Sequence, residues 1–482
     1  MLFNSFEFAI FLPIVFALYW VIPAEKTRLQ NLLLLAASYL FYGWWDWRYL
    51  SLILISTIVD YLVGRGLGRA DSARVRRLLL WTSVVVNLGM LGVFKYYNFF
   101  MSSLVSAFGT LGIVLRPESL RVLLPVGISF YTFQTLSYTI DVYGRRLEPE
   151  TDAIAFATFV AFFPQLVAGP IERARNLLPQ FKTARSFDYA KAVDGVRQIL
   201  WGLFKKVVVA DSCARFADLF FSNPEAYAGS ALFLGMIFFA FQIYGDFSGY
   251  SDMAIGIARL FGFGLMRNFA TPYFARDIAE FWRRWHISLS TWFRDYLYIP
   301  LGGSRGGTAR KIRNTLLIFA ISGLWHGANW TFLIWGVLNG LYFIPLLLRG
   351  KNRRYLSVVA ENRSFPSLAE TGGMALTFGL TLIAWVFFRS ATVQEAGVYL
   401  SELFSWSLFS VPEFPGRRSA ATTLCLIGVL LFVEWIGRNH EYGLQWVGLR
   451  WKGVSRAAVY YALVGAILWF GSAEQQFIYF QF

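Results

Sequence analysis

The stretch Ser322-Gly323-Leu324-Trp325-His326-Gly327-Ala328-Asn329-Trp330-Thr331 lies inside an apolar window that covers residues 315–349. The basic residues Arg313 and Lys351 bound this window, and 37 residues lie between them. A helix that crosses a membrane needs about 20 apolar residues, so this length suffices for two shortened passes. The window therefore predicts a helical hairpin over residues 314–350.

Similar apolar windows recur along almost the whole chain. They cover residues 8–23, 30–45, 49–64, 78–94, 153–168, 230–247, 374–388, 421–437 and 457–472. With 56% hydrophobic and only 15% charged residues, the composition is not that of a soluble globular protein. The apolar residues form intact blocks and do not alternate with polar ones, as they would in a membrane β-barrel. We predict an all-α polytopic membrane protein with one domain over residues 1–482 and roughly 10–12 transmembrane helices, some short or re-entrant.

The formal net charge of +15 would suggest a nucleic-acid partner for a soluble protein. Here the basic residues gather between the apolar windows, in clusters at 65–77, 205–206, 276–313 and 351–354. Cytoplasmic loops of membrane proteins carry such an excess of lysine and arginine. Membrane topology therefore explains the charge, and we predict contact with membrane lipid and no nucleic-acid partner.

Three segments interrupt the apolar pattern with polar residues and helix breakers. Residues 125–146 mix aromatic and hydroxyl side chains, and residues 162–175 contain two prolines and Glu172. Residues 242–252 contain Asp246 and Asp252 beside serine, tyrosine and glycine. Irregular or polar chain at membrane depth is tolerated where it is buried in protein or lines a cavity. These carboxylates are therefore candidates for a substrate path, although buried ion pairs would explain them as well.

Residues 261–313 are the least membrane-like part of the chain, and we predict an amphipathic segment on the cytoplasmic side. Aromatic and basic residues are interleaved in it, as in Phe281-Trp282-Arg283-Arg284-Trp285-His286. This pattern is typical of interfacial helices and would also suit an anionic donor such as a coenzyme A phosphate. The run Gly302-Gly303-Ser304-Arg305-Gly306 matches a nucleophile elbow in its letters, but that motif needs a preceding strand. We interpret it as a flexible basic loop.

His326 is one of three histidines and the one with membrane-type sequence on both sides. Eleven residues precede it from position 315, which corresponds to about 16 Å along a helix. Because a full crossing takes about 30 Å, His326 is predicted near the middle of the membrane. An ionisable group is costly there, so a functional role is the first hypothesis.

Histidine suits general acid–base chemistry because its ordinary pKa is near 6.5. In an acyl transfer it could accept the proton of an attacking hydroxyl group. A buried histidine that only packs between helices explains His326 equally well at this stage. His286 is a weaker candidate, and His440 has the surroundings of an ordinary loop residue. The chain contains no zinc motif, and Cys213 and Cys425 have no metal or redox spacing, so no metal is predicted.

Several motifs together resemble the membrane-bound O-acyltransferase superfamily, and within it the bacterial alginate O-acetyltransferase membrane proteins. The resemblance extends over nearly the whole chain. It is carried by 1–5, 39–44, 124–134, 165–171, 244–252, 281–303 and 322–331.

This resemblance implies that His326 matches the near-invariant family histidine and that His286 matches a second, upstream position. It implies a ring of helices around a funnel or tunnel, with the histidine at the constriction. The implied donor is an acetyl thioester, such as acetyl-coenzyme A, that arrives from the cytoplasm. The implied partners are a periplasmic acetyltransferase and the exopolysaccharide machinery.

We therefore predict an O-acyltransferase of the bacterial inner membrane that moves acetyl groups to an exported polysaccharide such as alginate. His326 would be the general base. Asn329 could orient its imidazole or hold the thioester carbonyl, and hairpin packing is an equally good explanation for that residue. Trp325 and Trp330 would wall the tunnel.

Three alternatives remain open from the sequence. The acceptor could be peptidoglycan, cellulose, another cell-wall polymer, or teichoic acid that receives D-alanine. The protein could be a transporter of an acyl carrier or a polymer precursor, although no internal symmetry supports this reading. It could also be a non-catalytic assembly subunit. No placed nucleophile is visible, which favours direct transfer over an acyl-enzyme.

Overall fold

The computed structural model describes residues 1–115, 120, 125–449, 451–471, 477 and 478. Within these ranges every regular element is a helix and no strand occurs. Seven helical runs are long and apolar enough to cross a membrane. They are Thr27–Arg69, Ala73–Thr110, Gly229–Leu260, Trp330–Leu348, Leu368–Arg389, Arg417–Ile436 and Gly453–Phe470. The prediction of an all-α polytopic membrane protein is confirmed.

Three of these runs, with 43, 38 and 32 residues, are longer than one crossing requires. Thr27–Arg69 has 43 residues and joins the windows predicted at 30–45 and 49–64. Two shorter apolar helical runs, Phe6–Val21 and Ala153–Leu166, match the predicted windows 8–23 and 153–168. The sequence windows thus located the apolar helices, whereas their junctions depend on local backbone geometry.

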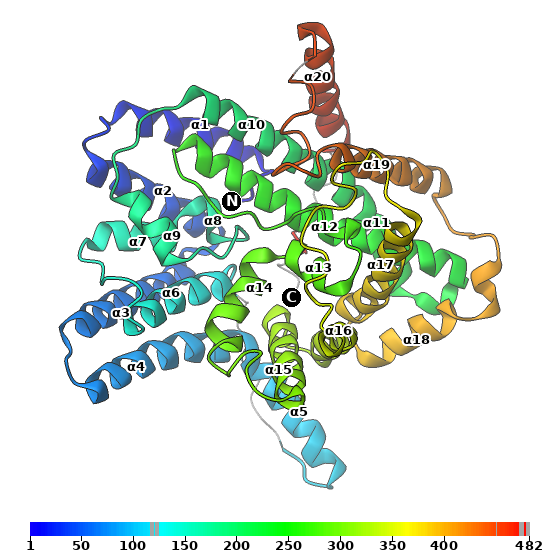
Figure 1. Cartoon of the computed structure of the whole chain (residues 1–482), viewed down its shortest axis with the longest axis horizontal. Helices are drawn as coiled ribbons and strands as arrows, with labels where there is room; N and C mark the ends of the chain where they lie inside the picture. The colour runs from blue at the N-terminus through cyan, green and yellow to red at the C-terminus, as the bar shows by residue number, and fades with distance from the viewer. Residues whose placement is uncertain (116–119, 121–124, 450, 472–476, 479–482) are drawn as a thin grey trace. The chain divides into compact units, whose positions relative to one another are not determined.

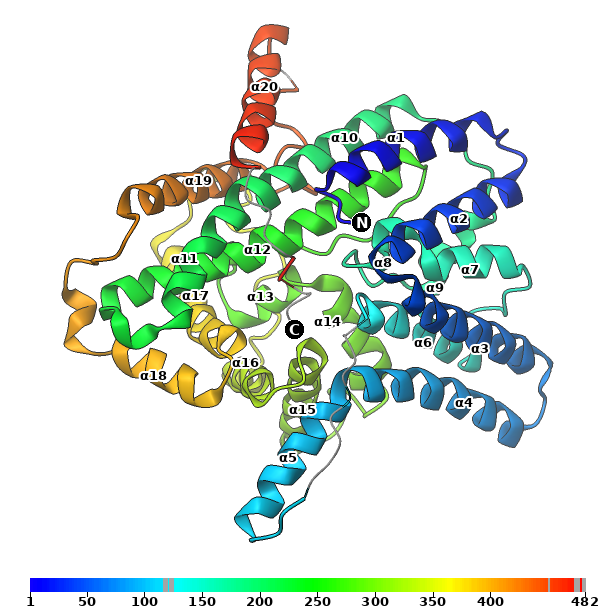
Figure 2. The ribbon, with the colours of Figure 1, turned by 180° about the vertical axis from the view of Figure 1, so that it is seen from behind.

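The described residues fall into two compact units. Unit 1 comprises Met1–Ala192 and Ile257–Met266, and unit 2 comprises Val193–Gly256 and the described part of Arg267–Phe482. Figures 1 and 2 show the elements of each unit.

Unit 1 is built from the helices of the N-terminal part of the chain. They are α1 (Phe6–Val21), α2 (Thr27–Asp46), η1 (Trp47–Tyr49), α3 (Leu50–Arg69), α4 (Ala73–Leu91), η2 (Gly92–Tyr96), α5 (Tyr97–Thr110), α6 (Ile128–Tyr143), α7 (Ala153–Ala161), α8 (Phe163–Leu166), α9 (Ala174–Leu177) and η3 (Leu178–Phe181).

Helices α3, α4 and α6 run side by side in both views (Figures 1 and 2), and a buried carboxylate joins them. Asp60 of α3 is 0% exposed. It accepts hydrogen bonds from Ser83 and Asn87 of α4 and from Thr139 of α6. A carboxylate at membrane depth is costly unless its oxygens are satisfied in this way. The polar side chains of these helices thus specify how they pack.

The segment with two prolines is broken, as the sequence indicated. Helix α7 ends at Ala161, α8 contains Pro164 near its start, and the chain from 167 to 173 is not helical. Residues 155–174 of unit 1 are almost all buried, and Phe163 packs among Phe8, Phe11 and Phe41. The non-helical backbone is therefore shielded by protein, which is the condition for its presence in a membrane.

Unit 2 contains the remaining elements together with most of two helices that begin or end in unit 1. They are α10 (Tyr189–Leu203), η4 (Phe204–Ala210), α11 (Asp211–Ser222), η5 (Pro224–Ala226), α12 (Gly229–Leu260), η6 (Pro272–Phe274), α13 (Ile278–Arg284), α14 (Ile287–Phe293), η7 (Arg294–Tyr298), α15 (Thr308–His326), α16 (Trp330–Leu348), α17 (Leu368–Arg389), α18 (Val393–Leu403), η8 (Trp406–Phe409), α19 (Arg417–Ile436) and α20 (Gly453–Phe470).

The hairpin of α15 and α16 depends on glycines at its contact face. A Cβ atom on Gly323 would lie 2.2 Å from the carbonyl oxygen of Phe332, and one on Gly336 would lie 2.3 Å from that of Phe319. Small residues at such positions let two membrane helices approach closely. The hairpin begins at Thr308, seven residues before the apolar window, because its first turns carry basic residues outside that window.

The segment 269–293 differs from the interfacial helix that its composition suggested. Trp285 is 1% exposed, Phe281 is 2% exposed and Arg284 is 8% exposed. The arginines are neutralised inside unit 2, where Glu280 pairs with both Arg276 and Arg284. Because these charges have partners, the aromatic face can pack against other helices and need not lie at a surface.

Candidate functional site

His326 is the last residue of α15 and is 3% exposed. The helix ends there because Gly327 takes up an extended conformation and a side chain at this position would overlap the ring of Phe332. Asn329 then starts α16 as its N-cap, with its side-chain oxygen accepting a hydrogen bond from the backbone N–H of Thr331. The imidazole is thus held at the tight turn of the hairpin.

Aromatic rings from three helices surround this imidazole. The ring centroids of Trp325 and Trp335 each lie 5.0 Å from that of His326, and the ring of Phe388 lies 5.4 Å away. Trp385 of α17 stacks on Trp335 with a centroid separation of 5.7 Å. These rings make the surroundings of His326 apolar and rigid, which strengthens any electrostatic interaction made inside them.

His286 lies next to His326, although 40 positions separate them in the sequence. Their ring centroids are 6.0 Å apart, and the ring of Trp325 lies 5.7 Å from that of His286. His286 is 0% exposed and adopts a left-handed backbone conformation with φ 43° between α13 and α14. A non-glycine residue in this region is uncommon and indicates a constrained site.

The backbone around His286 is fixed by a buried asparagine. The carbonyl oxygen of Asn268 accepts from the N–H of Ile287 at 2.9 Å, and its side-chain oxygen accepts from the hydroxyl of Ser288 at 2.9 Å. Burial lowers the pKa of His286 to about 3, so its imidazole is neutral at neutral pH. A neutral imidazole can both donate and accept a hydrogen bond.

The other predicted residues of the hairpin have different positions. Asn329 donates its side-chain N–H to the carbonyl of Ala391 at 2.8 Å, in addition to capping α16. Both polar ends of this side chain are therefore engaged with backbone groups. Trp325 lies in the cluster around the two histidines, whereas Trp330 is 51% exposed at the start of α16.

Asp246 and Asp252 of α12 form ion pairs with two buried lysines. Asp246 lies 2.8 Å from the amine of Lys206, and Asp252 lies 2.5 Å from that of Lys205. Both lysines are 2% exposed. The interpretation of Lys205 and Lys206 as a loop cluster was wrong, because carboxylates on the facing helix neutralise them within unit 2. The local sequence contains no signal of this pairing.

The end of the described chain also reaches this part of unit 2, which sequence reasoning missed. The backbone N–H of Ile478 donates to Asp246 at 2.6 Å. The ring of Phe477 lies 4.9 Å from that of Tyr250 and 6.4 Å from that of Phe247. Phe247 in turn lies 4.7 Å from His286. Apolar character was the sole available signal, and it does not distinguish this contact from ordinary packing.

The other residues that the sequence singled out lie elsewhere in the structure and are not part of the cluster around the two histidines. Glu172 lies in unit 1, where it accepts a hydrogen bond from Met266 and burial raises its pKa to about 7. His440 stacks on Trp446 in a loop. Ser304 lies in a loop that follows a helical segment, so the strand of a nucleophile elbow is missing there. Across the described ranges, no group of three His, Cys, Asp or Glu side chains could hold a metal ion.

Comparisons with known proteins identify the family of this chain. The family model described as MBOAT, membrane-bound O-acyltransferase family, matches residues 39–354. The chain is 38% identical to the probable alginate O-acetylase AlgI of Pseudomonas putida, with 99% of each chain covered. It is 41% identical to the protein of the same name from Azotobacter vinelandii, over 89% of this chain and 82% of that one. It is 32% identical to the peptidoglycan O-acetyltransferase of Helicobacter pylori, over 100% of this chain and 98% of that one.

Proposed function

The chain belongs to the membrane-bound O-acyltransferase family and is a multi-pass membrane acyltransferase, and we propose that it acetylates an exported polysaccharide. The donor would be a cytoplasmic thioester such as acetyl-coenzyme A. The acetyl group would pass to polysaccharide hydroxyls directly or through a periplasmic partner acetyltransferase. The membrane would be the bacterial inner membrane.

The observation that carries this proposal is the pair of buried imidazoles, His326 and His286, in an aromatic surround. Acyl transfer from a thioester to a hydroxyl group needs a base that accepts the hydroxyl proton during attack. A neutral histidine in a dry site can supply this function without a metal or a prior nucleophile. The fixed turn of the hairpin holds the base in one position, as catalysis by orientation requires.

In the proposed reaction, His326 accepts the proton of the acceptor hydroxyl group while its oxygen attacks the thioester carbonyl. The new C–O bond forms, the C–S bond breaks, and the leaving thiolate receives the proton from the imidazolium. His286 would position the imidazole or the reacting carbonyl from the neighbouring element. The engaged side chain of Asn329 favours its role as a helix cap over either catalytic role.

Alginate is the proposed acceptor, because relatives named for alginate O-acetylation are 38% and 41% identical to this chain over the aligned residues. Peptidoglycan is a second candidate, favoured by the relative from Helicobacter pylori that aligns over the full chain at 32% identity. Both acceptors present sugar hydroxyl groups outside the membrane, so the same chemistry would serve either.

The experiment that tests the proposal measures transfer from radiolabelled acetyl-coenzyme A by the purified protein in nanodiscs. Polysaccharide and the periplasmic partner are added, and wild type is compared with His326→Gln. We expect the substitution to reduce transfer by at least about 100-fold, as is typical for loss of a general base. His440→Gln is the matched control and should retain activity. Full transfer by His326→Gln would contradict the proposal, and alginate or peptidoglycan in parallel reactions would identify the acceptor.

A further inference from the structure

One buried threonine of the hairpin differs from the other buried threonines of unit 2. Thr377, Thr381 and Thr423 each donate their hydroxyl group to the carbonyl oxygen four residues earlier, at 2.8, 2.8 and 3.0 Å. Thr331 is 0% exposed, and its hydroxyl group has no hydrogen-bond partner among the residues that the structure describes. A buried hydroxyl group without a partner is destabilising, so its presence needs an explanation.

The position of Thr331 in the hairpin accounts for this open hydrogen bond. Thr331 is the second residue of α16, after the N-cap Asn329. The residue four positions earlier is Gly327, which has an extended backbone in the turn. A threonine inside a helix bonds a carbonyl one turn back, but no helical turn precedes Thr331. Its hydroxyl group is therefore available to a ligand.

Thr331 lies on the face of α16 that contacts His326. Residues four apart share one face of a helix, so Thr331 and Trp335 are neighbours along α16. The ring centroid of Trp335 lies 5.0 Å from that of His326. The turn between them is tight, because a side chain at Gly327 would overlap the ring of Phe332. The hydroxyl group thus lies on the side of the hairpin turn that holds the imidazole.

The backbone of Thr331 is held in place by the side chain of Asn329. Its Oδ1 atom accepts a hydrogen bond from the N–H group of Thr331 at 3.2 Å, and its Nδ2 atom donates to the carbonyl of Ala391 at 2.8 Å. Threonine is also stiff about χ1, because it is branched at Cβ. A donor with a fixed backbone and few rotamers is preorganised, as stabilisation of a transition state requires.

The start of α16 adds a favourable electric field at the same place. This helix has 19 residues, and its aligned peptide dipoles place about half a positive elementary charge at the first turn. The first turn contains no acidic residue that would cancel this charge. Negative charge that develops beside Thr331 is therefore stabilised by the helix dipole as well as by the hydroxyl group.

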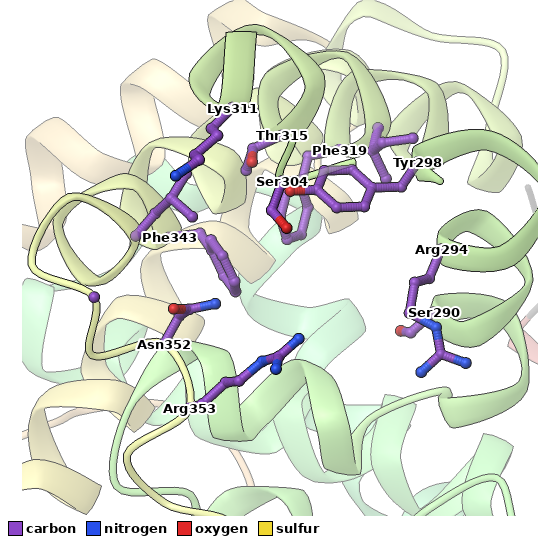
Figure 3. Close-up of a pocket in the computed structure, with 13 residues that line it drawn as sticks. Ser290, Arg294, Tyr298, Ser304, Lys311, Thr315, Phe319, Phe343, Asn352 and Arg353 are labelled. Carbon is purple, nitrogen blue, oxygen red and sulfur yellow. The ribbon is translucent and has the colours of Figure 1, made fainter. Parts of the chain in front are cut away.

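A cavity beside the hairpin provides a contrast to this position. It has a volume of about 460 Å³ and is lined by residues of α14, η7, α15, α16 and the adjoining loops (Figure 3). Ser304 and Arg353 in its lining are exposed, so water can satisfy their polar groups. Thr331 does not line this cavity and is fully buried. Its open hydrogen bond therefore belongs to the hairpin turn and to the histidine there.

We propose that the hydroxyl group of Thr331 donates a hydrogen bond to the carbonyl oxygen of the acyl group in the transition state of the transfer. This inference rests on the proposed function. The acceptor oxygen attacks the acyl carbon, His326 takes the proton of that oxygen, and negative charge develops on the carbonyl oxygen. Thr331 stabilises this charge and transfers no proton. The carbonyl then re-forms, the C–S bond breaks, and the leaving thiolate receives the proton from His326.

The test compares the transfer kinetics of Thr331→Val and Thr331→Ser in nanodiscs, with acetyl-coenzyme A, polysaccharide and the periplasmic partner. Valine has the shape of threonine without the hydroxyl group, and serine keeps that group. We expect kcat of Thr331→Val to fall at least about 100-fold, with KM within about twofold of wild type, as for loss of one oxyanion donor. Thr331→Ser should keep most of the activity.

The matched control is Thr423→Val, which removes a buried hydroxyl group of α19 that already has a partner in its own helix. Its kcat should equal that of wild type. Unfolding midpoints separate catalysis from structure. Because the hydroxyl group of Thr331 has no partner in the described protein, Thr331→Val should unfold at the temperature of wild type or above it. Thr331→Cys, with its weak S–H donor, replaces Thr331→Val if that variant does not fold.

A wild-type kcat in Thr331→Val would overturn the inference. A raised KM with unchanged kcat would also overturn it, since the hydroxyl group would then act in ground-state binding. Equal losses of kcat and of the unfolding midpoint in Thr331→Val and Thr331→Ser would assign Thr331 to structure alone. The proposed function fails separately, through full acetyl transfer by His326→Gln. An inactive His326→Gln beside a fully active Thr331→Val would overturn this inference and leave the proposed function intact.

Discussion

At the scale of single residues, the site depends on two histidines in unusual positions. His326 ends a helix at a turn that glycine permits, and His286 takes up a left-handed backbone conformation that few residues tolerate. The sequence identified both histidines as candidates, and it showed that apolar sequence lies on both sides of His326. The separation of 6.0 Å between their rings was not visible there, because it depends on how α13, α14 and α15 pack.

The neutral, buried state of His286 predicts a dependence of stability on pH. Its pKa is about 3 in the folded protein, against an ordinary 6.5, so the unfolded chain binds the proton first. This contribution to stability is fully present above pH 6.5 and is lost as the pH falls from 6.5 toward 3. The variant His286→Asn should lose less stability as the pH falls, since asparagine does not titrate. Asparagine also tolerates the positive φ at this position.

Thermal unfolding of wild type and His286→Asn at pH 7.5 and pH 5 measures this effect. The midpoint of wild type should fall further between the two pH values than that of the variant. All other acid-sensitive groups are common to both proteins and cancel in the comparison. An equal fall in both would show that His286 is not held neutral in the folded protein.

At the scale of elements, close helix packing fixes the hairpin that carries His326. The glycines Gly323 and Gly336 lie where the two backbones touch, and a methyl group on either would overlap a carbonyl oxygen. The apolar window predicted the hairpin. The exact face that each helix presents was not predicted, because an all-round apolar sequence has no periodicity from which to choose it.

Gly323→Ala should therefore destabilise the protein by about 1–3 kcal/mol, the usual cost of overpacking. Acetyl transfer should fall as well, because the helix end that carries His326 must shift. Gly379→Ala in α17 is the matched control, since a methyl group there has no neighbour within 4 Å. Unfolding midpoints and transfer rates of both variants are measured side by side, and equal effects would argue against a close contact at Gly323.

At the scale of the whole molecule, the described chain forms two compact units, and unit 2 contains the histidine pair, the cavity and the buried ion pairs. Lys205 and Lys206 lie in the π-helix η4 and join it to α12. Buried ion pairs cost desolvation, so removal of one partner leaves an uncompensated charge.

Lys205→Met should lower stability by up to about 3 kcal/mol, because it removes the cation that pairs with Asp252, whose side chain is 13% exposed and keeps only its hydrogen bond from Gln198. Lys205→Met/Asp252→Leu should recover most of this loss, which a double-mutant cycle on unfolding midpoints measures. Arg389→Met is the control, because its partner Asp218 is half-exposed and such pairs contribute about 0–1 kcal/mol. A double variant as unstable as Lys205→Met would show that the pair is not coupled.

The sequence by itself determined the helical membrane class, the family, and the hairpin with its histidine. Apolar length and short motifs are local properties that a chain carries before it folds. The tertiary structure decided the rest: the approach of His286 to His326, the burial of Lys205 and Lys206, and the cavity beside α15. Each of these joins residues far apart in the chain, and their proximity depends on helix packing rather than on any local pattern.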